Sequence, residues 1–293
     1  MESTLPPADL SSRVYVSQRL KLHYVDWGND GAPPLLLQHG GHDHCRTWDW
    51  VAERLRGDYH VVAPDLRGHG DSDWSPDGSY SLTTHVYDFA QLVHQRKLGP
   101  LRIVAHSLGG MIALRYAALY PETIERLVIV EGLGGLMQWE RDFAAQPIDA
   151  RIRGWIDQQR ALAARSPRRY ASIEEAFARM RAENGRLTPE QARHLTVHGV
   201  RQNEDGTYSW KFDNYTRPVT PVDIAPGALR RLWGRITCPT LLVWGRESWL
   251  PIPDEDRVAD FADARLTVLD GAGHWVHHDR LEGFVDQVRT FLK

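Results

Sequence analysis

The sequence is poor in cysteine and has no long apolar run. Only Cys45 and Cys238 occur among its 293 residues, which argues against a disulfide framework and favours free thiols. No apolar run approaches the roughly 20 residues that a membrane-spanning helix needs. Residues 1–7 lack both the basic segment and the apolar stretch of a signal peptide. We therefore expect a soluble, cytoplasmic protein.

Positive charge is not in excess either. Lys and Arg total 35 against 38 Asp and Glu, a formal net charge of -3, and no run rich in Lys and Arg stands out. Because nucleic-acid binding proteins need a basic surface, we expect no nucleic-acid partner. The length allows one large domain or two ordinary ones, with a substantial core.

Short apolar segments alternate with helical patterns over the first 130 residues. Those that indicate strands are residues 20–25, 34–38, 59–63, 101–105 and 126–130. Residues 45–55 and 80–98 instead place apolar side chains at helical spacing. This alternation predicts an α/β fold with a mainly parallel sheet and helices on both faces.

The strand pattern fades after Gly132 and resumes near Thr240. The residues between are mostly helical in pattern, apart from a possible short hairpin around residues 203–206. Residues 241–244 and 265–269 indicate two more strands. We predict a first part of the core over residues 1–132, a helical insert over 133–235 and a second part of the core over 236–293.

Ser107 lies between a strand pattern and a helix pattern. It follows the apolar residues 101–104 and precedes a segment with helical spacing. A sharp turn can expose a serine hydroxyl there only if the residues two before and two after it are small, and these are Ala105 and Gly109. A serine in this place is often only a helix cap, but the spacing indicates a nucleophile.

A serine nucleophile needs a base, an acid that orients the base, and donors for the oxyanion. The turn over residues 270–275 follows a strand and presents His274, the candidate base. Another strand ends in a glycine-rich turn at residues 39–42. There the N–H of Gly41, beside the N–H of Leu108, is expected to form the oxyanion hole.

These motifs resemble the α/β-hydrolase superfamily, specifically its serine hydrolases with an esterase-type core. The resemblance covers most of the chain, including the loop at residues 64–72 and the order in which Ser107 and His274 occur. It implies a mainly parallel, eight-stranded type of sheet flanked by helices, with an α-helical cap inserted after strand six. Ala105 replaces the first glycine of the family's Gly-x-Ser-x-Gly motif but is still small.

The acid has two candidates, because in this family it follows strand six or strand seven. Glu131 ends the apolar run 127–130, similar to the haloalkane dehalogenase branch. In the second stretch, residues 240–249, Ser248 stands where an aspartate is usual, and a hydroxyl cannot stabilise an imidazolium by charge. We therefore predict Glu131 as the acid, with Glu247 as the alternative.

All these candidates fall at the carboxyl ends of predicted strands, where active groups of such sheets gather. Further side chains are candidates for lining a substrate pocket: His39, His42, His106, Trp139, Trp249 and Trp275. His39 is also placed to brace the oxyanion turn. His39, His42 and His44 could suggest a metal site, but a glycine-rich turn does not supply the ordered surroundings that metal-bound histidines need. We expect no metal and no cofactor.

The resemblance implies hydrolysis of a small-molecule carboxylic ester or lactone through an acyl-enzyme. Haloalkane dehalogenases and epoxide hydrolases use a carboxylate nucleophile, so Ser107 argues against both. Two alternatives stay open. Carbon–carbon bond hydrolases and perhydrolases use the same triad, and some proteins of this fold are ligand receptors without turnover.

Overall fold

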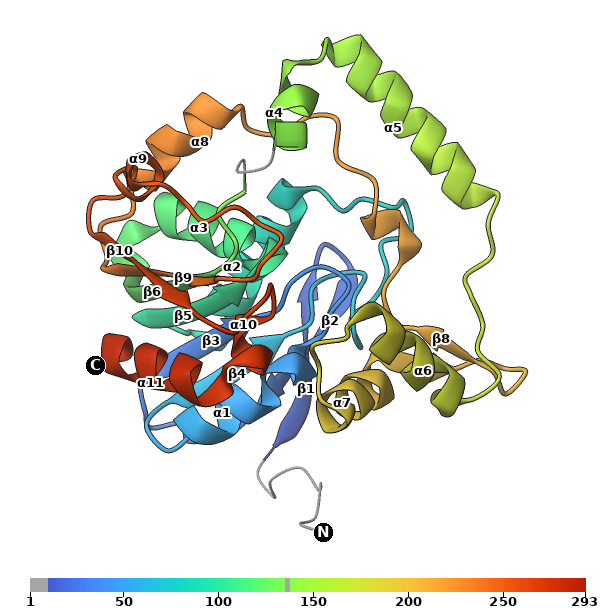
Figure 1. Ribbon diagram of the computed structural model, residues 1–293, viewed down its shortest axis with the longest axis horizontal. Helices are drawn as coiled ribbons and strands as arrows, with labels where there is room; N and C mark the ends of the chain where they lie inside the picture. The colour runs from blue at the N-terminus through green and yellow to red at the C-terminus, as the bar shows by residue number, and fades with distance from the viewer. Residues whose placement is uncertain (1–9, 135–137) are drawn as a thin grey trace.

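The computed structural model describes residues 10–134 and 138–293 (Figure 1). Eight strands form one sheet in the order β1-β2-β4-β3-β5-β6-β9-β10. β2 pairs antiparallel with β1 and with β4, and the remaining pairs are parallel. The strands are β1 (Ser11–Ser17), β2 (Leu20–Asp26), β3 (Pro34–Gln38), β4 (His60–Pro64), β5 (Leu101–His106), β6 (Ile124–Val130), β9 (Thr240–Gly245) and β10 (Ala264–Leu269). The predicted α/β fold with a mainly parallel sheet is confirmed.

Helices cover both faces of this sheet (Figure 1). α2 (Leu82–Arg96), α3 (Leu108–Leu119) and α8 (Pro226–Trp233) pack on one face, and α1 (Asp49–Leu55) and α11 (Leu281–Leu292) on the other. Along β5, Ile103 contributes to the first core and its neighbour Val104 to the second. Since successive strand residues face opposite sides, a strand covered on both sides is apolar throughout, which is why its sequence shows no alternation.

The edge strand β1 was not among the predicted strands. Its residues Val14 and Val16 are 61% and 54% exposed, whereas Tyr15 between them is buried. Only one face of the strand packs on the core, and Ser11, Ser12 and Arg13 make its beginning polar. A segment that is mostly polar and half open to solvent lacks the apolar run that marked the other strands.

The insert between β6 and β9 is mainly helical. It contains α4 (Gln138–Ala145), α5 (Ile148–Ala163), α6 (Ile173–Glu183) and α7 (Pro189–Gly199), followed by the antiparallel pair β7 (Val200–Gln202) and β8 (Tyr208–Trp210). The hairpin therefore forms where a turn was predicted. Figure 1 shows α5 standing away from the sheet, and none of its residues is buried. α8, in contrast, packs on α3 and so belongs to the core by its contacts.

Two connecting elements follow β9. α9 (Glu255–Val258) precedes β10, and α10 (Val276–Asp279) separates β10 from α11. Both cysteines are buried free thiols. Among the described helices, none combines the length and the apolar character needed to cross a membrane.

Candidate active site

Ser107 occupies a strained turn between β5 and α3. Its backbone has φ 52° and ψ -119°, a conformation that non-glycine residues rarely adopt. The Ser107 N–H donates to the carbonyl of Val130, which fixes the turn to the next strand. Small neighbours are required here, because a Cβ at Gly109 would lie 2.5 Å from the carbonyl oxygen of His39. The tight packing lifts the hydroxyl out of the core, and Ser107 is only partly buried.

His274, in the loop between β10 and α10, lies between two oxygen atoms. Its Nδ1 is 2.6 Å from Oε2 of Glu131, and its Nε2 is 3.1 Å from Oγ of Ser107. An ionised carboxylate can only accept hydrogen bonds, so Nδ1 carries the proton that it donates to Glu131. Nε2 is then free to accept the proton of the Ser107 hydroxyl. The structure thus brings the predicted nucleophile, base and acid into one hydrogen-bonded chain.

The carboxylate of Glu131 is buried at the end of β6 and held by three donors. Besides His274, the N–H of Gly245 donates to Oε1 at 2.8 Å, and the hydroxyl of Ser248 donates to Oε2 at 2.5 Å. A buried carboxylate without partners would be costly, and these donors satisfy it. Ser248 itself accepts from the N–H of Leu250, which orients its hydroxyl. Sequence reasoning treated Ser248 only as a missing acid. The signal that the sequence did offer was its place after β9, where an aspartate is usual.

Glu247, the alternative acid, lies elsewhere. Its side chain is 44% exposed and pairs with Arg186 at 3.0 Å. Its other oxygen accepts from the N–H of Gly271 at 3.1 Å. These contacts join the loops after β9 and β10, and among the described contacts none links Glu247 to His274.

Gly41 and Leu108, whose N–H groups are the predicted oxyanion donors, lie side by side. A Cβ at Gly41 would lie 3.7 Å from a methyl carbon of Leu108, so the two residues are neighbours. Leu108 begins α3, where N–H groups have no acceptor within the helix and the helix dipole favours negative charge. Within the described residues the N–H of Gly41 has no hydrogen-bond acceptor either. Both donors are therefore free for a ligand.

His39 supports this turn from below. It is fully buried, its Nε2 accepts from the N–H of Leu66 at 3.0 Å, and its Nδ1 donates to the carbonyl of Gly40 at 2.7 Å. Burial lowers the pKa of His39 to about 3, so the ring stays neutral. The expectation that it lines the substrate pocket is therefore wrong, because its side chain points beneath the turn.

The same correction applies to His106. It is also buried, its Nε2 lies 3.0 Å from the carbonyl oxygen of His274, and its ring packs against the ring of that histidine. Burial and the nearby His274 lower the pKa of His106 well below its usual value. His106 thus holds the base loop in place, a role that sequence reasoning missed because side-chain direction at a strand end is not readable from a pattern.

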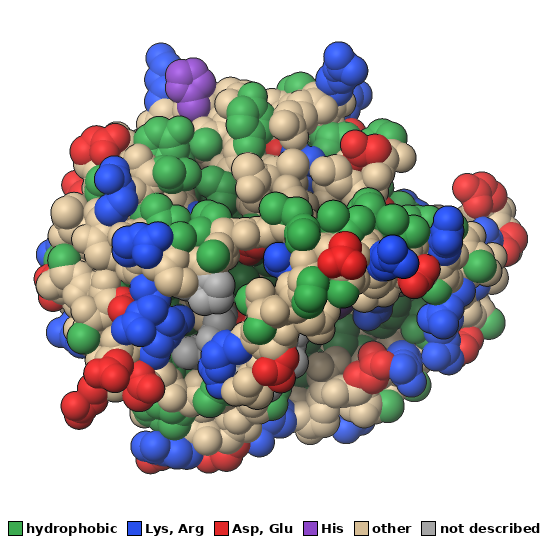
Figure 2. Space-filling model, turned by 90° about the horizontal axis from the view of Figure 1, so that it is seen from above, with side chains coloured by type: hydrophobic (Ala, Val, Ile, Leu, Met, Phe, Trp, Pro, Cys, Tyr) green, Lys and Arg blue, Asp and Glu red, His purple; other side chains and the backbone are tan. Residues whose placement is uncertain are grey.

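Two cavities border the site. The first, the arginine cavity, has a volume of about 420 Å³ and is lined by Gly41, His42, Pro167, Arg168, Tyr170, Arg179, Met180, Glu183, Asn184, Trp210, Phe212, Asn214, Arg217 and Trp275. The second, the apolar cavity, has about 400 Å³, and most of its lining surface is apolar, from residues that include Leu82, Leu108, Met111, Phe143, Pro218, Val219, Ile224 and Leu229. Its charged lining residues are Arg115, Arg141, Arg151, Arg217, Glu140 and Asp223, of which Arg115 and Asp223 form an ion pair. Arg217 lines both. From above, the molecule is hollowed, with hydrophobic side chains inside the hollow and charged side chains of both signs around it (Figure 2).

The remaining pocket candidates take different places. His42 and Trp275 line the arginine cavity, and their contact with substrate there stays a prediction. Trp249 is 64% exposed, and its ring centroid lies 5.0 Å from that of His274, so it covers the base at the surface. Trp139 belongs to α4, but its side chain lies outside what the structure describes.

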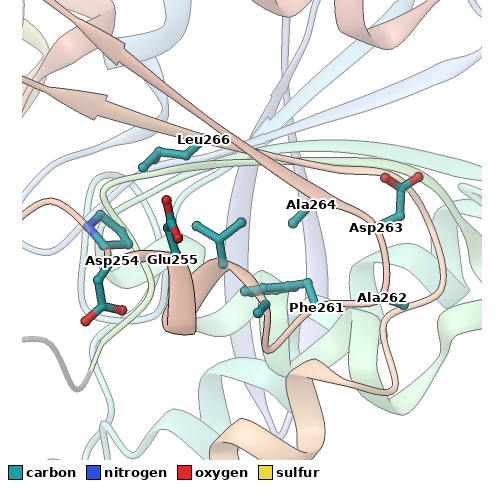
Figure 3. A pocket seen from close by; sticks show the side chains of 10 residues that line it. Asp254, Glu255, Phe261, Ala262, Asp263, Ala264 and Leu266 are labelled. Carbon is teal, nitrogen blue, oxygen red and sulfur yellow. The ribbon is translucent and has the colours of Figure 1, made fainter.

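A third cavity of about 490 Å³ lies between α9 and β10 (Figure 3). Ten of the residues from Pro253 to Leu266 line it, with Phe261 among them. None of the residues of the site takes part in this lining, so the nucleophile does not open into it.

Three groups of side chains in the described part bring His, Cys, Asp or Glu close enough for a metal ion. Each group contains a carboxylate that already forms an ion pair with a His or Arg side chain. Asp65 pairs with His23, Asp49 with Arg46 and Asp26 with His60. None of the groups includes Ser107, Glu131 or His274.

Comparison with known proteins places the chain among hydrolases. A family model described as alpha/beta hydrolase fold matches residues 33–281. An esterase of Mycobacterium tuberculosis is 26% identical over 275 residues, covering 91% of this chain and 84% of that protein. The 3-hydroxybutyrate-oligomer hydrolase of Cupriavidus necator is 30% identical over 242 residues, 78% of this chain and 77% of that one. The structure of a thioesterase domain from the curacin biosynthetic pathway superposes with a TM-score of 0.82 at 24% identity, covering 96% of this chain and 99% of the domain.

Proposed function

The chain belongs to the alpha/beta hydrolase fold family, and we propose that this hydrolase cleaves carboxylic esters or lactones with Ser107, His274 and Glu131 as its triad. The observation that carries the proposal is the hydrogen-bonded chain from Ser107 Oγ through the imidazole to Glu131. The names of two relatives, an esterase and a 3-hydroxybutyrate-oligomer hydrolase, support an ester as substrate.

The proposed reaction follows from the positions of the groups. Ser107 Oγ attacks the substrate carbonyl while Nε2 of His274 takes the hydroxyl proton. Glu131 orients the imidazole and stabilises its charged form. The N–H groups of Gly41 and Leu108 hold the oxyanion of the tetrahedral intermediate, and His274 then donates the proton to the leaving alcohol. A water molecule, activated by the same histidine, releases the acid from Ser107.

The insert and the exposed Trp249 are assigned to substrate binding. Of the residues that line the arginine cavity, all but Gly41, His42 and Trp275 come from the insert. The insert, apart from α8, which packs on the core, therefore acts as a cap that shapes the space above Ser107, while the core supplies the reacting groups.

A panel of esters and lactones of increasing acyl length tests the proposal. We expect at least one ester or lactone to be hydrolysed at a rate that depends on acyl length, because one of two bounded cavities has to accept the chain. If Ser107 reacts with a fluorophosphonate but no member of the panel is hydrolysed, the site serves a ligand receptor or another bond, and the proposal fails.

A further inference from the structure

The arginine cavity contains more positive than negative charge. Arg168, Arg179 and Arg217 line it, and Glu183 is the one acidic residue of its described lining. Arg179 and Glu183 form an ion pair on successive turns of α6. Among the residues that the structure describes, Arg168 and Arg217 form no ion pair with a carboxylate. Two guanidinium groups of this cavity, both on solvent-exposed residues, are therefore without a carboxylate partner among the described residues.

Aromatic rings hold these two guanidinium groups. Arg168 lies over the ring of Tyr170 at 5.1 Å, and Arg217 lies over the ring of Phe212 at 5.2 Å. Tyr170 is buried and accepts a hydrogen bond from the indole of Trp210, which fixes the platform. Stacking on a ring face leaves the edge of a guanidinium free to donate, and its fork matches a carboxylate. Among the contacts of the described residues, Arg217 donates through its Nε alone, to Asn214.

The cavity reaches residues next to the reaction centre, although Ser107, His274 and Glu131 do not themselves line it. Gly41 and Trp275 both line it, the first at the oxyanion turn and the second directly after His274. His42 is exposed on one side, but the loss of water around its ring, together with the positive charge of Arg217, lowers its pKa to about 3. His42 therefore stays neutral at ordinary pH and adds no charge, while its ring packs on Phe212 beneath Arg217.

We propose that the substrate is an ester carrying a carboxylate, which Arg217 and Arg168 bind in the arginine cavity while an uncharged part of the same substrate occupies the apolar cavity. This inference rests on the proposed function and narrows its substrate class. The uncompensated charge beside the oxyanion turn favours an anion, and the second cavity offers a mostly apolar wall for the remainder.

Matched pairs of esters test the inference. One pair is mono-4-nitrophenyl adipate and its methyl ester, with the charge on the acyl side. The other is 4-carboxyphenyl butanoate and its methyl ester, with the charge on the alcohol side. In at least one pair we expect the ratio of kcat/KM for the charged ester to that for the neutral ester to fall about tenfold in Arg217→Gln, and further when Arg168→Gln is added.

Arg181→Gln is the control, since Arg181 is an exposed arginine of the same insert that does not line the cavity. It should keep the ratio within about twofold. If Arg217→Gln and the double variant keep the ratio in both pairs as Arg181→Gln does, the inference is wrong while the esterase proposal stands. Failure of every ester, the neutral ones included, would instead count against the proposed function.

A binding measurement keeps the inference testable without turnover. Adipate binding to Ser107→Ala is measured by calorimetry, alone and combined with Arg217→Gln. We expect the Kd to rise about tenfold or more on loss of Arg217 and to stay unchanged on loss of Arg181. Equal adipate affinity in all three proteins, or no detectable binding to any of them, contradicts the inference.

Discussion

The core and the insert contribute to the site in different ways. The core brings Ser107, Glu131 and His274 together from the ends of three strands and holds them with hydrogen bonds centred on the buried carboxylate of Glu131. The insert contributes mainly exposed or half-buried side chains, and its helix α5 buries none. Chemistry that depends on atomic positions thus rests on the packed sheet, whereas selection among substrates rests on a looser layer. Substitutions of the reacting groups in the core should abolish turnover, whereas substitutions in the insert should change the relative kcat/KM for different substrates.

Removing the nucleophile is expected to have the largest effect. Ser107→Ala should lower kcat for any ester substrate by about three orders of magnitude or more, because no acyl-enzyme can form. Its hydroxyl caps no backbone N–H of α3, so thermal unfolding should stay close to that of the wild type. Steady-state kinetics and a melting curve check both. Substantial residual turnover would mean that another group attacks the substrate.

The acid of the triad is tested by a matched pair of substitutions. Glu131→Gln keeps the shape but removes the charge beside His274, and we expect kcat to fall by about a thousandfold or more. Glu247→Gln removes only an exposed ion pair with Arg186 and should change kcat less than about threefold. The assignment of Glu131 is wrong if Glu247→Gln alone loses activity.

Ser248 is expected to show a smaller effect through Glu131. Ser248→Ala removes one of the three donors to the carboxylate and should lower kcat about tenfold, with little change in KM. The carboxylate then attracts the imidazole proton more strongly, so the acidic limb of the kcat/KM profile should move to higher pH. Ser248→Thr, which keeps a hydroxyl, should restore both readouts. A profile identical to that of the wild type would show that Ser248 only fills space.

The interface between core and insert is expected to lose stability at acidic pH. His278 is buried there, hydrogen-bonded to Thr47, and its backbone carbonyl accepts from Gln191 of the insert. Burial lowers its pKa to about 3, against roughly 6.5 in the unfolded chain. Between these pH values the unfolded state binds more protons than the folded state. The contribution of the neutral His278 to the free energy of unfolding is therefore fully present above about pH 6.5 and is lost as the pH falls toward 3.

The expected size of this effect is about 1 kcal/mol per pH unit below pH 6, measured by urea unfolding. His278→Gln should reduce the pH dependence of the free energy of unfolding by that amount. His94→Gln, at an exposed histidine of α2, is the control and should leave it unchanged. Equal pH dependence in both variants would contradict the burial argument.

Much of the core was predictable because short stretches of sequence determine its strands, turns and helices. The strand, turn and helix around Ser107 and the carboxyl-end positions of Glu131 and His274 follow from short patterns, and the sheet then aligns them. The direction of a side chain at a strand end does not follow in this way, so His39 and His106 were placed in the pocket although they lie beneath it.

The insert was less predictable because its contacts are long-range. Arg168 and Arg217 are distant in sequence, and only the packing of the β7–β8 pair and its neighbours brings them to one cavity.

Ser248, in the loop after β9, is a residue whose position was identified but whose role was not. Its hydrogen bond to Glu131 depends on the exact approach of two loops.

The central claim is that His274 activates Ser107, and the rate of labelling by a fluorophosphonate tests it most directly. The account predicts that peptide mapping of the wild-type protein finds the adduct on Ser107, and that His274→Ala slows its formation by at least a hundredfold. An adduct on a different residue, or equal labelling rates with and without the imidazole, would contradict it.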